Sequence, residues 1–241
     1  MERALSGGME MDHYQSFLNK MDGIYSKFPG RLEELRRLGT QPESMVLRRE
    51  GCYAVAFGHG ASISGLLASH SEAVGQTVPA MVYQAEKIQT TVTPFALVDN
   101  FVGNPQDQAV AILRRAVEYA LEDVPAQVLG SRQIQFRGWF YSRGIVMAPG
   151  WPNKEQFQTV QAILAGCQRM GFQPRGPWGS HCMVNRFLTA VSPEGCQDLY
   201  RLIDEAPVLD VCSQAPTLSV LDNTILPNGQ FECSMHNTWH L

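Results

Sequence analysis

A chain of 241 residues with 44% hydrophobic and 17% charged residues can bury a sizeable core, as one large domain or two small ones. No apolar run is long enough to cross a bilayer, and the first fifteen residues lack the basic start and apolar stretch of a secretory signal. The net charge of −4, with scattered arginines, argues against a large duplex nucleic-acid surface. We expect a soluble cytoplasmic protein with a small-molecule or nucleotide-like ligand and no membrane partner; its oligomeric state stays open.

The cysteines predict neither a disulfide framework nor a metal centre. They are widely spaced, without a Cys-x-x-Cys pair or paired Cys/His ligand spacing. They are Cys52, Cys167, Cys182, Cys196, Cys212 and Cys233. Reduced, buried thiols are the expectation, with no metal and no cofactor.

The first half of the chain predicts helices around a few strands. Residues 1–50 are polar and helical in tendency, with a break at Pro29 and Gly30, so we expect an N-terminal extension of two short helices. Residues 52–60 predict a buried strand, and 61–75 a helix that stops at Gly75. One or two strands follow in 80–97, and then an amphipathic helix in 107–124.

The second half alternates strands and helices. Residues 132–150 predict a long strand or a hairpin bent at 142–144. A helix in 153–171 begins at Asn153 with Gln156 at the capping-box position. A strand in 179–191 and a helix after Ser192 and Pro193 precede a hairpin of 216–226 and 230–241. Together these elements predict an α+β fold with antiparallel sheets, in which residues 51–241 form a single domain.

Two strands of this pattern have polar centres. The stretch "KIQTTVTPF" (87–95) and the stretch 179–188 flank an intervening helix, strand and helix, as in an internal repeat. By alternation one face of the first carries Gln89, Thr91 and Thr93. By the same rule one face of the second carries His181, Met183 and Asn185, with Arg186 on the other. The two strands are expected to line opposite halves of one cleft, although a threonine-rich, half-exposed strand needs no function.

The element order and these strands resemble the two-histidine phosphoesterase superfamily, the fold of RNA-end-joining and cyclic phosphodiesterase proteins. Its signature is two His-x-Thr/Ser-apolar strands; here the second falls on "HCMV" from His181 and the first on "QTTV" from Gln89. The resemblance covers residues 50–241. It implies a two-lobed antiparallel scaffold with flanking helices and a pseudo-twofold repeat, and a metal-independent, cyclic phosphodiesterase-like hydrolase.

The departures from that signature bear on chemistry. In the family one histidine acts as base, the other as acid, and the two hydroxyls donate to the phosphoryl group. Here Gln89 replaces a histidine, and Met183 replaces a hydroxyl residue. The resemblance then leaves His181 as the general acid/base, with Gln89 and Thr91 as donors to the phosphoryl oxygens.

Other side chains are candidates for ligand binding beside Thr93, Met183 and Asn185. Tyr141 and Arg143 offer a phenol and a guanidinium to an anion; alternatively Tyr141 packs and Arg143 is solvated at a bend. Trp178, shortly before His181, either stacks on a ligand ring or covers a core edge.

Three further histidines have competing interpretations. His59, in "FGHGAS", either forms a small anion-binding site ahead of a helix or sits in a turn. His70 falls on the apolar stripe of its helix and is expected to be a core histidine. His236, in "HNT", is the rival of His181 as the motif histidine.

The sequence thus supports an enzyme that acts on a phosphoester or related small molecule, with His181 as the remaining acid/base. The alternatives are a non-catalytic nucleotide- or anion-binding protein, and a scaffold that now runs a non-phosphoryl elimination or isomerisation.

Overall fold

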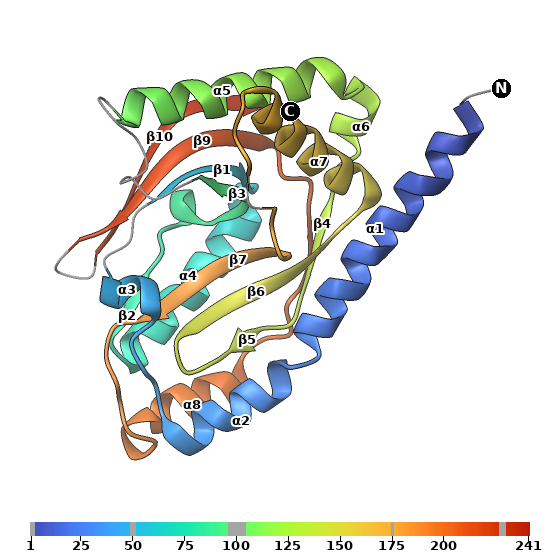
Figure 1. Ribbon diagram of the computed structural model, residues 1–241. Coiled ribbons are helices and arrows are strands. Elements are labelled where there is room, and N and C mark those ends of the chain that lie inside the picture. The colour runs from blue at the N-terminus through green and yellow to red at the C-terminus, as the bar shows by residue number, and fades with distance from the viewer. Residues whose placement is uncertain (1–2, 49–51, 96–104, 175, 227–229) are drawn as a thin grey trace.

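The computed structural model describes the backbone of residues 3–48, 52–95, 105–174, 176–226 and 230–241 (Figure 1). Its strands form one antiparallel sheet in the order β10-β9-β1-β3-β7-β6-β4-β8, with β2 paired to β7 and β5 paired to β6. The strands are β1 (Cys52–Gly58), β2 (Ala80–Val82), β3 (Gln89–Phe95), β4 (Ile134–Arg137), β5 (Phe140–Tyr141), β6 (Ile145–Pro152), β7 (Ser180–Phe187), β8 (Asp210–Ser213), β9 (Thr217–Ile225) and β10 (Phe231–His240).

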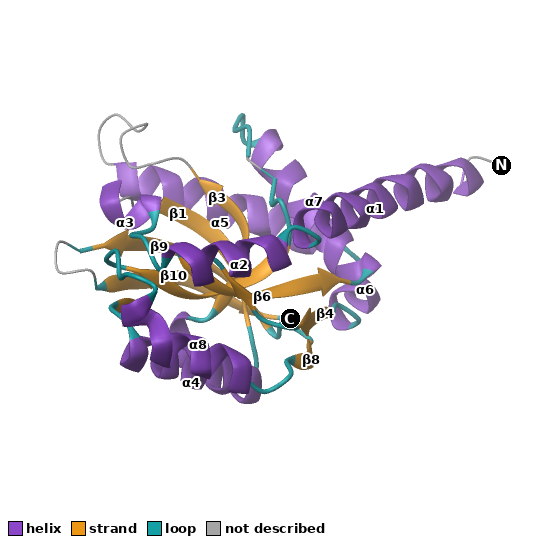
Figure 2. Ribbon diagram, turned by 90° about the horizontal axis from the view of Figure 1, so that it is seen from below, coloured by secondary structure: helices purple, strands orange, loops and turns teal. Residues whose placement is uncertain are grey.

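Helices cover the sheet in two groups. They are α1 (Arg3–Tyr25), α2 (Phe28–Leu38), α3 (Ser44–Arg48), α4 (Ala61–Thr77), α5 (Pro105–Asp123), α6 (Ala126–Gly130), α7 (Lys154–Arg169) and α8 (Gln197–Glu205), with 3-10 turns at Ala85–Lys87 and Glu194–Cys196. Helices α5 and α7 pack on each other and cover β1 and β9. Figure 2 shows α4 and α8 side by side below the strands, where they cover the β7, β6 and β4 half. The α+β class predicted from the sequence is confirmed.

The sheet is built as two halves that meet at β3 and β7. The path β10-β9-β1-β3 lies on one side and β7-β6-β4-β8 on the other, so each polar-centred strand is the inner strand of its half. Within the described strands, the register pairs β3 with β7 at one position, Thr90 opposite Cys182. The two motif strands therefore diverge from a single joint.

Each motif strand also departs from regular pairing just after its second polar position. The register of β3 against β1 shifts between Val55 and Ala56, so β3 carries one extra residue near Val92. The register of β6 against β7 shifts between Val146 and Met147, so β7 carries one extra residue at Val184. A β-bulge of this kind reverses the face on which all later side chains lie.

Several expected boundaries are corrected. The break between the first two helices comes before Pro29 and not at it, and α1 is one long helix. Pro29 lies in the first turn of α2, where proline is favoured. Helix α4 continues past Gly75 to Thr77. Short elements without a strong apolar period, namely α3, α6 and β8, were not expected. The expected turn of the last hairpin, residues 227–229, lies outside the described residues.

Other expectations are confirmed in detail. The stripe of α5 is buried at Ala109, Leu113, Ala116, Val117 and Ala120. The side chain of Asn153 caps α7 by accepting the backbone N–H of Gln156 at 2.9 Å, and Gly171 follows the helix with a φ of +75°. None of the described helices is long and apolar enough to span a membrane.

Candidate functional site

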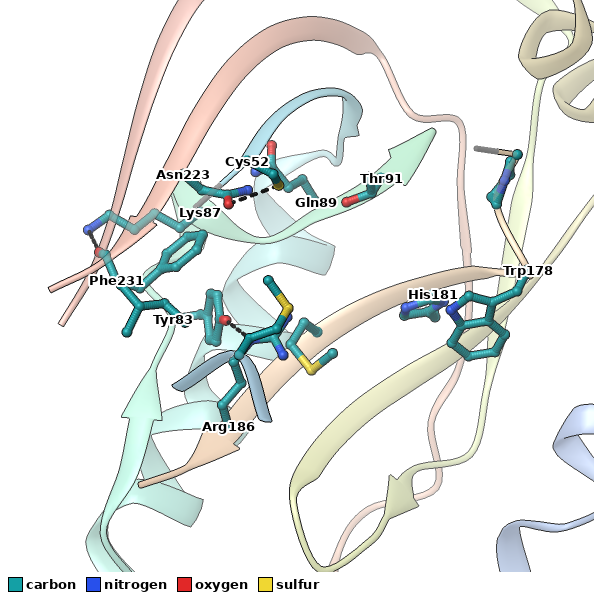
Figure 3. Close-up of a pocket in the computed structure, with 16 residues that line it drawn as sticks. Cys52, Tyr83, Lys87, Gln89, Thr91, Trp178, His181, Arg186, Asn223 and Phe231 are labelled. Atoms are coloured by element: carbon teal, nitrogen blue, oxygen red, sulfur yellow. Dashed lines mark hydrogen bonds between the residues drawn. The ribbon is translucent and has the colours of Figure 1, made fainter. Parts of the chain in front are cut away.

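A pocket of about 310 Å³ opens where the two motif strands diverge (Figure 3). Gln89 and Thr91 of β3 and His181 and Met183 of β7 all line it. The expected shared cleft is therefore present in the structure, and the four positions of the two degenerate motifs face one cavity.

The bulges change which residues come next. Thr93 and Asn185 are both fully buried outside the pocket, which corrects the simple alternation expected from the sequence. The amide of Asn185 donates instead to the backbone oxygens of Ser71 at 2.9 Å and Met81 at 3.0 Å. The extra residue in β7 turns Arg186 into the pocket, although regular alternation places it on the opposite face.

His181 is held by an aromatic stack. The indole of Trp178 stacks on its ring, with centroids 4.2 Å apart and planes inclined by 29°. Burial, with a smaller effect from the Arg186 charge, lowers the pKa of His181 to about 4, so the imidazole is neutral at pH 7. Nδ1 is buried and has no hydrogen-bond partner among the described residues.

We assign the tautomer of the free protein from that unpartnered nitrogen. An N–H buried without an acceptor is among the rarest arrangements in folded proteins, so the ring proton belongs on Nε2. His181 lines the pocket, with its ring stacked against Trp178 on the pocket wall. The histidine therefore presents a hydrogen-bond donor to a ligand.

Among the described residues, the cations Lys87 and Arg186 line the same pocket. Arg186 donates to Glu43 at 2.8 Å and to the Tyr83 hydroxyl at 3.0 Å, and the Glu43 carboxylate compensates its charge. Lys87 donates from Nζ to the backbone oxygen of Phe231 at 3.1 Å, which ties the 3-10 turn that precedes β3 to the first residue of β10 (Figure 3). A negatively charged ligand would meet both groups.

The wall of the pocket that carries Gln89 is only weakly polar. Gln89 Nε2 lies 3.6 Å from Cys233 Sγ, and Cys52 Sγ donates to Asn223 Oδ1 at 3.2 Å. Burial raises the pKa of the Cys233 thiol, which favours its protonated form. Gln89 thus keeps an amide donor that a better acceptor can capture.

Trp178 sits on the short loop of residues 176–179 that forms one wall of the pocket. Besides stacking on His181, it meets the edge of Tyr25 from α1, with ring centroids 6.2 Å apart. The hydroxyl of Tyr25 donates to the backbone oxygen of Gly150 at 3.3 Å. The N-terminal helix therefore supports the wall that carries Trp178.

Tyr141 and Arg143 lie elsewhere. The Tyr141 hydroxyl is within 2.8 Å of His70 Nε2 in the core, and Arg143 Nε donates to the Gly39 backbone oxygen at 3.1 Å. Both stabilise internal contacts, and neither lines the pocket as the structure describes it. His70 is the buried core histidine that the sequence predicts.

His236 also lies apart from the pocket. Its Nε2 is 2.8 Å from Asp222 Oδ2, and Asp222 alternates in β9 with Asn223, which faces the pocket. Of the two candidate motif histidines, His181 is the one in the cavity.

Sequence reasoning missed Lys87, Tyr83, Arg186 and Asn223 as lining residues. Lys87 could have been predicted from the sequence, because Lys87, Gln89 and Thr91 share the period of a strand. Predicting Arg186 required knowledge of the bulge, and predicting Asn223 required the register of β9 on β1.

Within the described part of the chain no group of three or more His, Cys, Asp or Glu side chains is arranged to hold a metal ion.

No family model matches the sequence, and no curated protein matches it. Solved structures do. TT0787 of Thermus thermophilus matches with a TM-score of 0.54 at 10% identity, over 79% of this chain and 97% of that chain. Escherichia coli LigT in apo form gives 0.49 at 12% identity, over 80% and 98%. LigT complexed with 3'-AMP gives 0.48 at 11% identity, over the same shares.

These structures belong to the two-histidine phosphoesterase superfamily. At such low identity a match speaks for the fold alone, and the TM-score to TT0787 is high enough to carry that argument. The chain therefore has the two-histidine phosphoesterase fold, as the two motif strands predicted.

Proposed function

We propose that the protein acts on a small, nucleotide-like phosphoester in this pocket, with His181 as its single proton-transfer residue. The observation that carries the proposal is the convergence of Gln89, Thr91, His181 and Met183 on one cavity that also contains Lys87 and Arg186. Thr91 and the Gln89 amide supply donors to phosphoryl oxygens, and the exposed part of Trp178 supplies a ring surface.

The Gln89 replacement and the tautomer of His181 both predict slow turnover. Gln89 exchanges no proton at neutral pH, and one positioned acid or base is typically worth about 10²- to 10⁴-fold in rate. His181 is neutral at pH 7, which is the form that accepts a proton. To accept it on Nε2, however, the ring must place its proton on the unpartnered Nδ1, at a cost of about 1–3 kcal/mol.

Binding without turnover is the second candidate function, and the unpartnered Nδ1 of His181 favours it. With the proton on Nε2, His181 donates directly to a phosphoryl oxygen and needs no change of tautomer. Met183 provides apolar contact where the signature has a hydroxyl. Such a pocket holds an anion through neutral donors and two cations.

The experiment measures turnover by mass spectrometry on cyclic nucleotides and oligonucleotides ending in 2′,3′-cyclic phosphate. The variants are His181→Ala and Gln89→His, with His236→Ala as the control because its imidazole bonds to Asp222 outside the pocket. Slow turnover that disappears in His181→Ala and survives in His236→Ala supports the enzyme.

Melting temperatures with inorganic phosphate and nucleotides complete the design, because a ligand stabilises the folded state that binds it. Stabilisation without turnover in the wild type, with turnover gained in Gln89→His, establishes the binding protein. If neither turnover nor stabilisation occurs with any of these compounds, phosphoryl recognition is refuted and the scaffold serves a different reaction.

A further inference from the structure

A second polar cluster lies behind the pocket, around His59. Nε2 of His59 is 3.1 Å from Thr90 Oγ1 and 3.2 Å from Cys182 Sγ, and these two atoms are themselves 3.3 Å apart. Nδ1 of His59 is 2.7 Å from Ser213 Oγ. One imidazole thus contacts β3, β7 and the end of β8.

The residues that His59 contacts on β3 and β7 lie within the two motifs. Thr90 lies between Gln89 and Thr91, and Cys182 lies between His181 and Met183. Their side chains therefore point away from the pocket, directly behind the motif residues. Thr90 and Cys182 also form the one position at which the register pairs β3 with β7 in the described strands.

The hydrogen bonds of the cluster have a consistent assignment. Ser213 Oγ accepts the backbone N–H of Ala215 at 3.1 Å, so its own proton is free to be donated to His59 Nδ1. Nε2–H of His59 then donates to Thr90 and Cys182. The Cys182 thiol stays protonated, since burial raises its pKa to about 12, so the cluster is neutral and is no reactive thiolate site.

We propose that His59 is a positioning residue that fixes the separation of β3 and β7, and so holds both sets of motif side chains in a single pocket. Within the described strands the joint has one paired position, where the Thr90 and Cys182 side chains also touch, and His59 adds a contact to each of these side chains. The consequence for ligand binding rests on the proposed function, whereas the structural role is measurable without any ligand.

The test follows the titration of the His181 ring by NMR in His59→Leu, His59→Gln and the control His70→Leu. Loss of the bridge widens the joint and admits water to His181, whose pKa we expect to rise by roughly one unit or more toward its ordinary value. Gln offers both a donor and an acceptor, so His59→Gln should restore most of the wild-type titration. His70→Leu also removes a buried imidazole bond, but to Tyr141, and should leave His181 unchanged.

An unchanged His181 titration in folded His59→Leu overturns the proposal, as does an equal shift in His70→Leu. If His59→Leu does not fold, the double variant Thr90→Val with Cys182→Ala removes both contacts to His59, together with the direct Thr90–Cys182 contact, while keeping His59, and a shift at least as large is required of it. Affinity for inorganic phosphate is measured in parallel. A titration shift in a protein that binds no phosphate or nucleotide refutes the proposed function and leaves the role of His59 standing.

Discussion

Arg186 shows how one side chain sets the charge of the pocket. It lines the cavity, but Glu43 neutralises it through a close, mostly buried ion pair whose side chains are 14% and 16% exposed. The Tyr83 hydroxyl accepts a further hydrogen bond from the guanidinium. The geometry of the arginine is therefore fixed, while its field on a ligand is largely cancelled by a carboxylate outside the lining.

Glu43→Gln should strengthen binding of anions. The amide oxygen still accepts from Arg186, but the compensating charge is lost, which is worth on the order of 1 kcal/mol to an anion in the pocket, or roughly fivefold in Kd. Stability should fall, because the arginine is left with its charge unpaired. Calorimetric titration with inorganic phosphate measures the first effect and urea unfolding the second.

The control for this change is Glu34→Gln, which removes a carboxylate from an exposed pair with Arg31 on α2. We expect it to alter neither quantity, since exposed pairs contribute little. A phosphate Kd that is the same in Glu43→Gln as in the wild type would show that Arg186 does not face the bound anion.

At the scale of elements, regular periodicity explains what the sequence could predict. The stripes of α5 and α7, the cap at Asn153 and the buried core of β1 follow from apolar spacing and local chemistry, and all were predicted. Bulges break that regularity. Thr93, Asn185 and Arg186 were placed on the wrong faces because each follows an extra residue whose presence depends on pairing with β1 or β6.

The candidate site divides in the same way. Gln89, Thr91, His181 and Met183 precede the bulges, so alternation predicted their common face. Asn223 reaches the pocket from β9 and Phe231 from β10, through neighbours in the sheet that no local pattern encodes. His59 was expected in a turn or an anion site, and its contacts to Thr90 and Cys182 exist only in three dimensions.

Helix α1 is expected to stabilise the pocket wall through Tyr25. Tyr25→Leu removes the aromatic contacts to Trp151 and Trp178, whereas Tyr25→Phe keeps the ring and loses only the hydroxyl bond to Gly150. We predict faster amide hydrogen exchange at Gly176, Trp178 and Gly179 in Tyr25→Leu and little change there in Tyr25→Phe. Equal exchange in both variants would show that the ring of Tyr25 does not support this loop.

At the scale of the whole molecule, buried histidines make stability depend on pH. Burial lowers the pKa of His59, His70 and His181 to about 4. In the unfolded chain these groups titrate near 6.5, so between these values the unfolded state binds more protons. The free energy of unfolding is therefore highest above about pH 6.5 and falls as the pH is lowered toward 4.

His70 should contribute most clearly, because it is only 7% exposed. We expect His70→Gln to flatten the dependence by up to about 1.4 kcal/mol per pH unit, the equivalent of one proton. Urea unfolding at pH 7, 6 and 5 measures the slope, and His240→Gln near the C-terminus is the control. An identical slope in all three proteins would contradict a neutral, buried His70.

Sheets usually come apart from their edges, where strands have one neighbour. Among the described strands the least hydrogen-bonded joint lies in the middle, since β3 and β7 share a single paired position while each is firmly paired on its other side. The two halves of the sheet are thus joined through few backbone hydrogen bonds, and the cavity lies between their inner strands. A compound that contacts Gln89 and His181 together would bridge the two halves of the sheet, so we expect its binding to make the protein more rigid.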